Sequence, residues 1–228
     1  EIEFDKIPSR AGFIYKNAFA RRDIIKAKYE AFAKDENTKV NAKTLYPYEC
    51  VAEAMRVTNS GWGYYGRNTS DVDRAMINKY WANLEDYIKG ATFNGMAIVD
   101  TSGSMCGSNA DAPINVAISL GMYCAEKAKG PFAGHFLTFS KNPNLVKVEG
   151  VDFCDKVDRI IRTDLCENTD IEKTFDMLLD TAVRTRCKPS DLSNSLIVIS
   201  DMEFDAARGR GYGYGYGYSK NYKKKKKA

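Results

Sequence analysis

The sequence feature that most constrains the fold is a short apolar run that ends in a cluster of polar residues. Met96-Ala-Ile-Val99 includes two consecutive β-branched residues and is followed by Asp100-Thr-Ser-Gly-Ser104. A continuous apolar run of this length is typical of a buried strand in a parallel sheet. The polar cluster then lies at the carboxyl end of that strand, which is where open α/β sheets place their ligand sites.

Three of these polar residues carry oxygen donors of the kind that hold a hard metal ion. Asp100 supplies a carboxylate, and Ser102 and Ser104 supply hydroxyls at alternate positions. Such donors suit Mg²⁺ or Mn²⁺ and not Zn²⁺. A second buried run, over residues 195–200, also ends on an aspartate, Asp201. The two aspartates would lie side by side if their strands are neighbours in the sheet.

The remaining pattern predicts a helical region followed by alternating strands and helices. Residues 1–92 carry apolar residues at three- and four-residue spacings, with helix starts expected at Pro47 and Ser70. The helix after Ser70 is expected to run to Gly90. Strands are expected at 95–100, 135–140, 144–148 and 195–200, and helices at 113–129, 152–163 and 171–186. This order predicts an α/β fold with a mainly parallel sheet covered by helices on both faces.

The chain divides by composition into three parts. They are an α-helical region (1–92), an α/β domain (93–207) and a Gly/Tyr- and Lys-rich tail (208–228). The tail holds eight basic residues and no acid, so residues 1–207 have a net charge of −4 although the whole chain has +4. Only the tail is therefore biased toward nucleic acid, and its composition is typical of disorder.

Asp100-Thr-Ser-Gly-Ser104 resembles the DxSxS signature that opens the adhesion-type metal site of von Willebrand factor type A (vWA) domains. The resemblance implies that Ser102 and Ser104 bind the ion through their hydroxyls, and that Thr169 does so directly or through water. It also implies that Asp100 and Asp201 hold coordinated waters. The implied metal set is Asp100, Ser102, Ser104, Thr169 and Asp201, with Mg²⁺ or Mn²⁺ as cofactor. Such an ion keeps an open position for an acidic side chain or a phosphate.

The wider sequence resembles the family related to the Ro ribonucleoprotein (TROVE) proteins, in which an α-helical region precedes a vWA domain. The resemblance covers about residues 1–205, and its best motifs are 96–105 and 198–205. Residues 1–92 are too few for the closed ring through which Ro proteins bind RNA, so RNA binding does not carry over. A vWA sheet would continue past Asp201, where this chain enters its repeats. We therefore expect strand 195–200 to be an exposed sheet edge unless something covers it. Either the sequence is incomplete or interrupted near residue 206, or a partner supplies the cover.

The same residues allow other interpretations. Asp100 to Ser104 could form only a turn capped by its own side chains, and Thr169 could only cap the helix from 171, a role for which Asp170 competes. A serine hydrolase needs a histidine base, and the single histidine, His135, is expected at the opposite end of the sheet. An aspartyl phosphatase needs a second carboxylate where Ser102 stands. We therefore predict no enzymatic activity.

Three functions follow as hypotheses. The first is a binding and assembly module whose Mg²⁺ site docks an acidic group of a protein partner. The second makes the partner RNA, with the basic tail adding affinity, and the third is a structural component of a large particle such as a virion. The six cysteines form no CxxC pair, so reduced thiols and a cytoplasmic, virion or ribonucleoprotein location are expected. No sequence segment is long and apolar enough to predict a membrane span.

Overall fold

The structure is a computed structural model, and it describes most of the chain before the tail. The described residues are 2–60, 70–88, 94–107, 109–130, 132–139, 143–163, 171–189 and 195–202. Thr169 and Asp170 lie outside them, as do Gly90 and the tail.

The amino-terminal region is helical, as the sequence predicts. Its elements are a 3₁₀ turn η1 (Phe4–Lys6) and helices α1 (Ser9–Arg21), α2 (Asp23–Lys34), α3 (Pro47–Thr58) and α4 (Asp71–Ala82). Pro47 occupies the first turn of α3, where its missing N–H costs nothing. Ser70 caps α4 by accepting a hydrogen bond from Asp73 N, and the Asp73 carboxylate accepts one in return from Ser70 N. Both predicted helix starts are confirmed.

Helix α4 ends earlier than predicted, at Ala82. The chain beyond it is held against another helix by one tyrosine. Tyr123 Oη accepts a hydrogen bond from Tyr87 N at 2.8 Å and donates one to Glu85 O at 3.2 Å. These bonds take backbone groups that a continuing helix would use itself, so the prediction of one helix up to Gly90 is wrong.

The second half of the chain contains one four-stranded sheet. Its strands are β1 (Gly95–Asp100), β2 (His135–Phe139), β3 (Leu145–Lys147) and β4 (Ser195–Ile199), in the spatial order β3-β2-β1-β4. Strand β1 pairs in parallel with both β2 and β4, and β3 pairs antiparallel with β2. The predicted mainly parallel α/β sheet is confirmed, as is the prediction that the strands ending at Asp100 and before Asp201 are neighbours.

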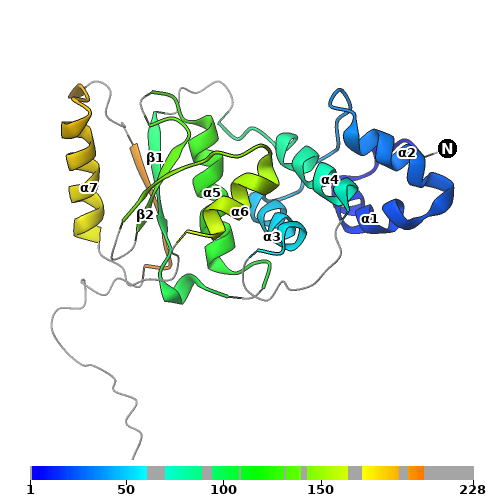
Figure 1. The fold of residues 1–228 in the computed structure, drawn as a ribbon, viewed down its shortest axis with the longest axis horizontal. Helices are drawn as coiled ribbons and strands as arrows, with labels where there is room; N and C mark the ends of the chain where they lie inside the picture. Colours follow the sequence, from blue (N-terminus) through cyan, green and yellow to red (C-terminus); the bar gives the residue numbers. More distant parts are fainter. Residues whose placement is uncertain are drawn as a thin grey trace, which may run out of the picture.

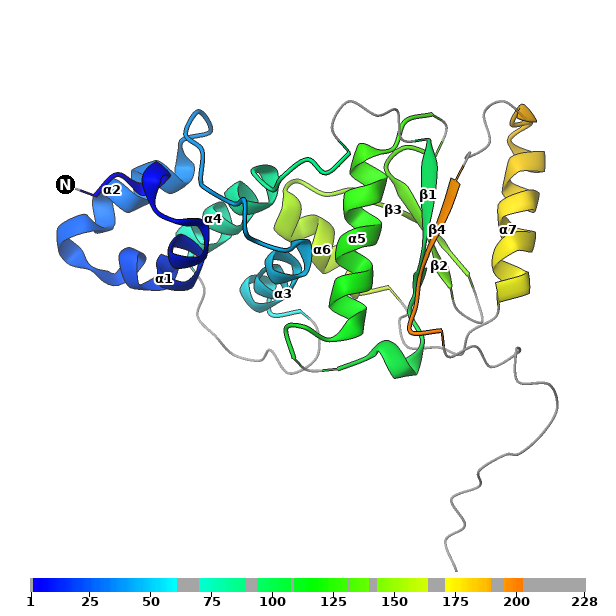
Figure 2. The ribbon, with the colours of Figure 1, turned by 180° about the vertical axis from the view of Figure 1, so that it is seen from behind.

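Helices cover both faces of this sheet. Helix α5 (Pro113–Lys127) packs on one face, with α6 (Phe153–Ile161) and α3 beyond it, and α7 (Ile171–Arg184) covers the other (Figures 1 and 2). Ala97 and Val99 of β1 belong to the core on the α5 side, whereas Met96 and Ile98 belong to the smaller core beneath α7. The alternation follows from the two-residue repeat of a strand.

The helical region packs directly against the α/β part. Trp81 of α4 stacks on Phe153 of α6 with ring centroids 4.2 Å apart. Arg74 of α4 donates two 2.7 Å hydrogen bonds to Asp152, the residue that caps α6. The main hydrophobic core runs without interruption through α3, α4, α5 and α6. Residues on the two sides of position 92 therefore share one core, although composition separates them.

Strand β4 is an exposed edge. Leu196, Ile197 and Val198 are 37%, 38% and 41% exposed, whereas every residue of β1 is buried. Helix α7 adds exposed Phe175, Leu179 and Val183. The edge expected from the sequence is present, at least for the part of the chain that is described.

Two further predictions, on membrane spans and on the cysteines, can be compared with the described residues. None of the helices there is both long and apolar enough to cross a membrane. Cys50, Cys124, Cys154 and Cys187 are free thiols, but Cys106 is disulfide-bonded, so the expectation of reduced thiols is wrong for that residue.

Candidate functional site

The candidate site lies where β1 and β4 end at the same edge of the sheet. The parallel register pairs Val99 with Ile199, which brings Asp100 beside Ser200 and places Asp201 one residue further along. After Asp100 the chain leaves the strand and forms a short 3₁₀ turn, η2 (Gly103–Met105). The apolar run before each polar cluster forms a strand, and the parallel pairing of the buried strand β1 with the edge strand β4 brings the two clusters together.

Asp100 is the buried centre of the site. It is 0% exposed, and its two carboxylate oxygens each accept one hydrogen bond. Oδ1 accepts from Ser102 N at 2.9 Å, and Oδ2 accepts from Ser200 Oγ at 2.5 Å. The first bond is the aspartate turn that the sequence left open as an alternative. That turn accounts for one carboxylate oxygen only.

The two serine hydroxyls of the motif face each other. Ser102 Oγ and Ser104 Oγ lie 3.0 Å apart, with Ser102 nearly buried and Ser104 exposed. Ser102 precedes the η2 turn, but its side chain makes no capping hydrogen bond. The hydroxyl is therefore not committed to ending the turn. These two hydroxyl oxygens, one buried and one at the surface, lie beside the Asp100 carboxylate. We call this cluster of oxygen donors the cradle.

Ser200 is the site residue to which the sequence analysis assigned no role. Its hydroxyl donates to Asp100 Oδ2 and accepts from Met202 N at 2.9 Å. Met202 has a left-handed backbone (φ 66°), which turns the chain sharply after the strand. The pairing of Asp100 with Ser200 follows from the register of β1 against β4, which no local sequence signal gives.

Two other predicted metal ligands, Asp201 and Thr169, take no part in the described hydrogen bonds of Asp100. Asp201 is exposed at the end of β4, and the hydrogen bonds of Asp100 go to Ser102 and Ser200. Thr169 lies outside the described residues, so its role as a ligand stays a prediction. The neighbouring Thr101 is fully buried, and its Oγ1 has no hydrogen-bond partner among the described residues.

The donor set fits a hard divalent cation. A fully buried carboxylate is costly unless a positive charge compensates it, and no basic side chain pairs with Asp100 in the described ranges. The oxygens around it come from hydroxyls and a carboxylate, which Mg²⁺ prefers. No group of three or more His, Cys, Asp or Glu side chains occurs among the residues described, which leaves the hydroxyl-based cradle as the metal candidate there.

A histidine-dependent reaction does not fit this edge of the sheet. Strand β2 pairs Phe139 with Asp100, so His135 begins the strand at the opposite end, as predicted. Four residues of strand separate His135 from Phe139, the partner of Asp100, which corresponds to roughly 13 Å along the strand. The His135 ring lies 2.9 Å from Ala133 O through Nδ1, a local contact of the turn before β2.

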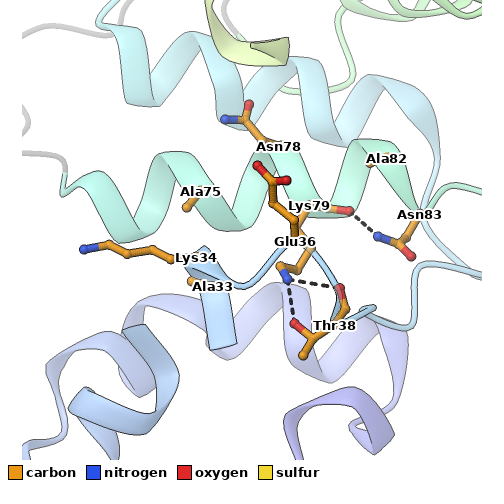
Figure 3. A pocket seen from close by; sticks show the side chains of 9 residues that line it. All are labelled: Ala33, Lys34, Glu36, Thr38, Ala75, Asn78, Lys79, Ala82 and Asn83. Carbon is orange, nitrogen blue, oxygen red and sulfur yellow. Dashed lines mark hydrogen bonds between the residues drawn. The ribbon is translucent and has the colours of Figure 1, made fainter. Parts of the chain in front are cut away.

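A cavity of about 440 Å³ lies elsewhere, between α2 and α4 (Figure 3). Its one buried cation, Lys79, donates hydrogen bonds to Thr38 O at 3.1 Å, to Thr38 Oγ1 at 2.7 Å and to Asp35 O. Burial lowers the pKa of Lys79, but all three ammonium hydrogens have acceptors. The lysine therefore holds the loop after α2 in place.

Comparisons with known proteins give two matches. The model of a family described as a domain of unknown function, DUF7788, matches residues 94–228. "Uncharacterized protein L728" of Acanthamoeba polyphaga mimivirus is 30% identical over 220 residues, covering 90% of this chain and 36% of that protein. The chain thus spans little more than a third of the length of this relative. No solved structure matches the chain.

Proposed function

Because the chain belongs to the DUF7788 family, whose description names no activity, we propose its function from the cradle itself: a non-enzymatic binding module. In this proposal a Mg²⁺ ion (or Mn²⁺) at the ends of β1 and β4 docks an acidic group of a protein partner. The domain would be vWA-like, in line with the resemblance of Asp100 to Ser104 to the DxSxS signature.

One observation carries the proposal. The Asp100 carboxylate is fully buried, has hydrogen bonds but no ion pair among the described residues, and lies beside two facing hydroxyls. A structural turn alone would not need a buried charge at this position, since a neutral side chain can cap a turn equally well. A bound cation would compensate the buried negative charge of Asp100.

Ser102 and Ser104 would bind the ion directly, and Asp100 would act from behind them. The ion would supply an electrophilic position that an incoming carboxylate can fill. Asp100 would fix the loop through Ser102 N and hold the hydrogen of Ser200 Oγ. Because hydroxyls are neutral, this ligand set would leave the ion more positive than a set of carboxylates would, which favours an acidic partner.

Metal binding tests the first half of the proposal. We expect isothermal titration with MgCl₂ to show one site in the wild-type chain and none in Ser102→Ala. Ser195→Ala is the matched control, because Ser195 lies exposed at the opposite end of β4. No Mg²⁺ binding to the wild type, or equal binding to both variants, would contradict the proposal.

Carboxylate binding tests the second half. We expect acetate, as the simplest carboxylate probe, to bind the wild-type chain with Mg²⁺ present and not with EDTA. Binding of acetate that does not depend on the metal would remove the docking mechanism.

RNA is the second candidate partner, because residues 208–228 hold eight basic residues and no acid. Binding through the tail would fall steeply with salt and survive Ser102→Ala. Binding of RNA phosphate at the metal would be lost in Ser102→Ala and with EDTA. A single-stranded oligonucleotide measured with both variants separates these outcomes from the protein-docking proposal.

A further inference from the structure

A second polar cavity lies in the amino-terminal region, away from the cradle, and is lined by residues of α1, α2 and α3 and of the start of α4. It has a volume of about 200 Å³, and its lining includes Asn17 and Arg21 of α1, Lys26 of α2, Arg56 of α3 and Ser70 before α4. We propose that this cavity binds a phosphate group, free or at the end of a small molecule.

Two lining residues present buried polar atoms without partners among the described residues. Arg56 donates from Nε to Glu53 at 2.8 Å, but its Nη2 is buried without an acceptor. Asn17 Oδ1 is likewise buried and unpartnered. Buried polar groups in folded proteins nearly always have a partner, because leaving one unpaired is costly. The cavity therefore calls for a molecule that can hydrogen-bond to its wall.

The charged groups around the cavity decide whether an anionic or a cationic ligand fits. Lys26 has Glu30 at 4.0 Å, and the Asp73 carboxylate is held in the helix cap by Ser70 N and Ser70 Oγ, both at 3.1 Å. Arg21 is exposed and pairs with no described residue. The groups left with spare hydrogen-bond donors are thus Arg21, the Nη2 of Arg56, and Lys26, whose 4.0 Å contact with Glu30 is too long for a hydrogen bond. The missing ligand is an anion.

Geometry and size narrow the anion to a phosphate group. Guanidinium groups bind planar or tetrahedral oxyanions through paired N–H donors. The cavity is smaller than the roughly 300–1,000 Å³ of pockets that take large organic ligands. The Asn17 amide can join as a donor with its oxygen and nitrogen exchanged, an orientation that hydrogen bonding decides.

Titration of the full chain with inorganic phosphate tests the proposal, in a buffer with EDTA and without other oxyanions. We expect Arg21→Gln to weaken phosphate binding at least about tenfold, the usual effect of losing a charged hydrogen bond. Arg22→Gln is the matched control, because Arg22 is also exposed but does not line the cavity. Equal affinity of both variants, or no binding by the wild type, would overturn the proposal.

Three more measurements define the site. Arg56→Gln should abolish binding, with the fold checked by circular dichroism; Arg21→Gln keeps the test valid should this variant unfold. Ser102→Ala should bind phosphate as the wild type does, which separates the cavity from the metal cradle; loss of binding in Ser102→Ala would overturn the proposal. Glycerol phosphate, titrated in parallel, shows whether the cavity prefers a phosphate ester to the free ion.

Discussion

Ser200 Oγ donates a hydrogen bond to Asp100 Oδ2 across the β1–β4 pair, and it thereby joins the two strand ends of the candidate site. This bond and the one from Ser102 N satisfy the carboxylate oxygens but leave their negative charge uncompensated within the described residues. Hydrogen bonds reduce the cost of burying a charge without removing it. A bound cation, as proposed for this site, would therefore stabilise it.

Asp100→Asn should separate the metal-free from the metal-bound stability of the chain. In EDTA we expect the free energy of unfolding to stay the same or to rise, because the buried charge is gone. With Mg²⁺ at a hundred times its dissociation constant, the wild type should gain about 2.7 kcal/mol. The variant should gain much less. Urea unfolding with and without Mg²⁺ measures both.

The control for this experiment is Asp111→Asn, which removes an exposed carboxylate from the loop before α5. Its response to Mg²⁺ should match that of the wild type. A wild type whose unfolding is insensitive to Mg²⁺ would contradict the cation-stabilised site.

The Arg74–Asp152 pair should link the helical region to α6 with a measurable coupling energy. Burial opposes ionisation of Asp152, but hydrogen bonds from Arg74, Asp155 N and Asn78 outweigh it and lower the pKa of the carboxyl. A lowered pKa contributes stability that is present above the ordinary carboxyl pKa and is lost as the pH falls through the folded-state pKa. We expect a coupling of about 1–2 kcal/mol at neutral pH, discounted for partial exposure.

A double-mutant cycle of Arg74→Gln and Asp152→Asn measures this coupling, at neutral pH and again in acid. The coupling should shrink in acid as Asp152 takes up a proton. The exposed pair Lys147–Glu149 is the control, and its coupling should be much weaker because solvent screens both charges. Equal couplings for the two pairs would show that the α4–α6 contact does not depend on its ion pair.

The sequence predicts well what depends on neighbouring residues. The apolar runs 96–99 and 195–199 became the central and edge strands, and Pro47 and Ser70 began helices, because each signal acts within a few residues. The early end of α4 could not be predicted, since it depends on Tyr123, which lies far along the chain. The role of Ser200 depends on strand register in the same way.

The second cavity could not be predicted from the sequence either, because it also depends on contacts between distant segments. The phosphate cavity needs residues of α1, α2 and α3 and of the start of α4, and no local pattern marks Asn17, Arg21 and Arg56 as its lining. For the cradle, Asp100, Ser102 and Ser104 are adjacent in sequence, so a motif reveals them. Partners contributed by other strands or loops appear only once the sheet is assembled.

The exposed edge of β4 should drive self-association. Val198 is 41% exposed on a strand without charged or proline residues, the type of edge that pairs with other chains. We expect Val198→Lys to reduce the concentration-dependent mass measured by analytical ultracentrifugation. Ile24→Lys is the control, because Ile24 is 97% exposed on α2 and away from the sheet. Equal effects of both changes would show that general hydrophobicity, and not the edge, causes association.

Gly121 of α5 sets how closely this helix approaches β1, and its replacement should destabilise the fold. A Cβ at this position would lie 2.5 Å from Val99 Cγ2, closer than atoms can pack. Gly121→Ala should therefore cost about 1–3 kcal/mol of unfolding free energy, although alanine is the better helix former. Gly103→Ala, with nothing within 4 Å of its added Cβ, should change stability by less than about 0.5 kcal/mol.

Val99→Ala provides the decisive background for this prediction, because it removes the atom that clashes. In that background Gly121→Ala should be neutral or stabilising, as measured by urea unfolding. A cost that persists in the double variant would place the close contact elsewhere, with the Phe136 ring at 3.4 Å as the next neighbour. Since Val99 directly precedes Asp100, a helix displaced here should also weaken Mg²⁺ binding, which the same titration as for Ser102→Ala detects.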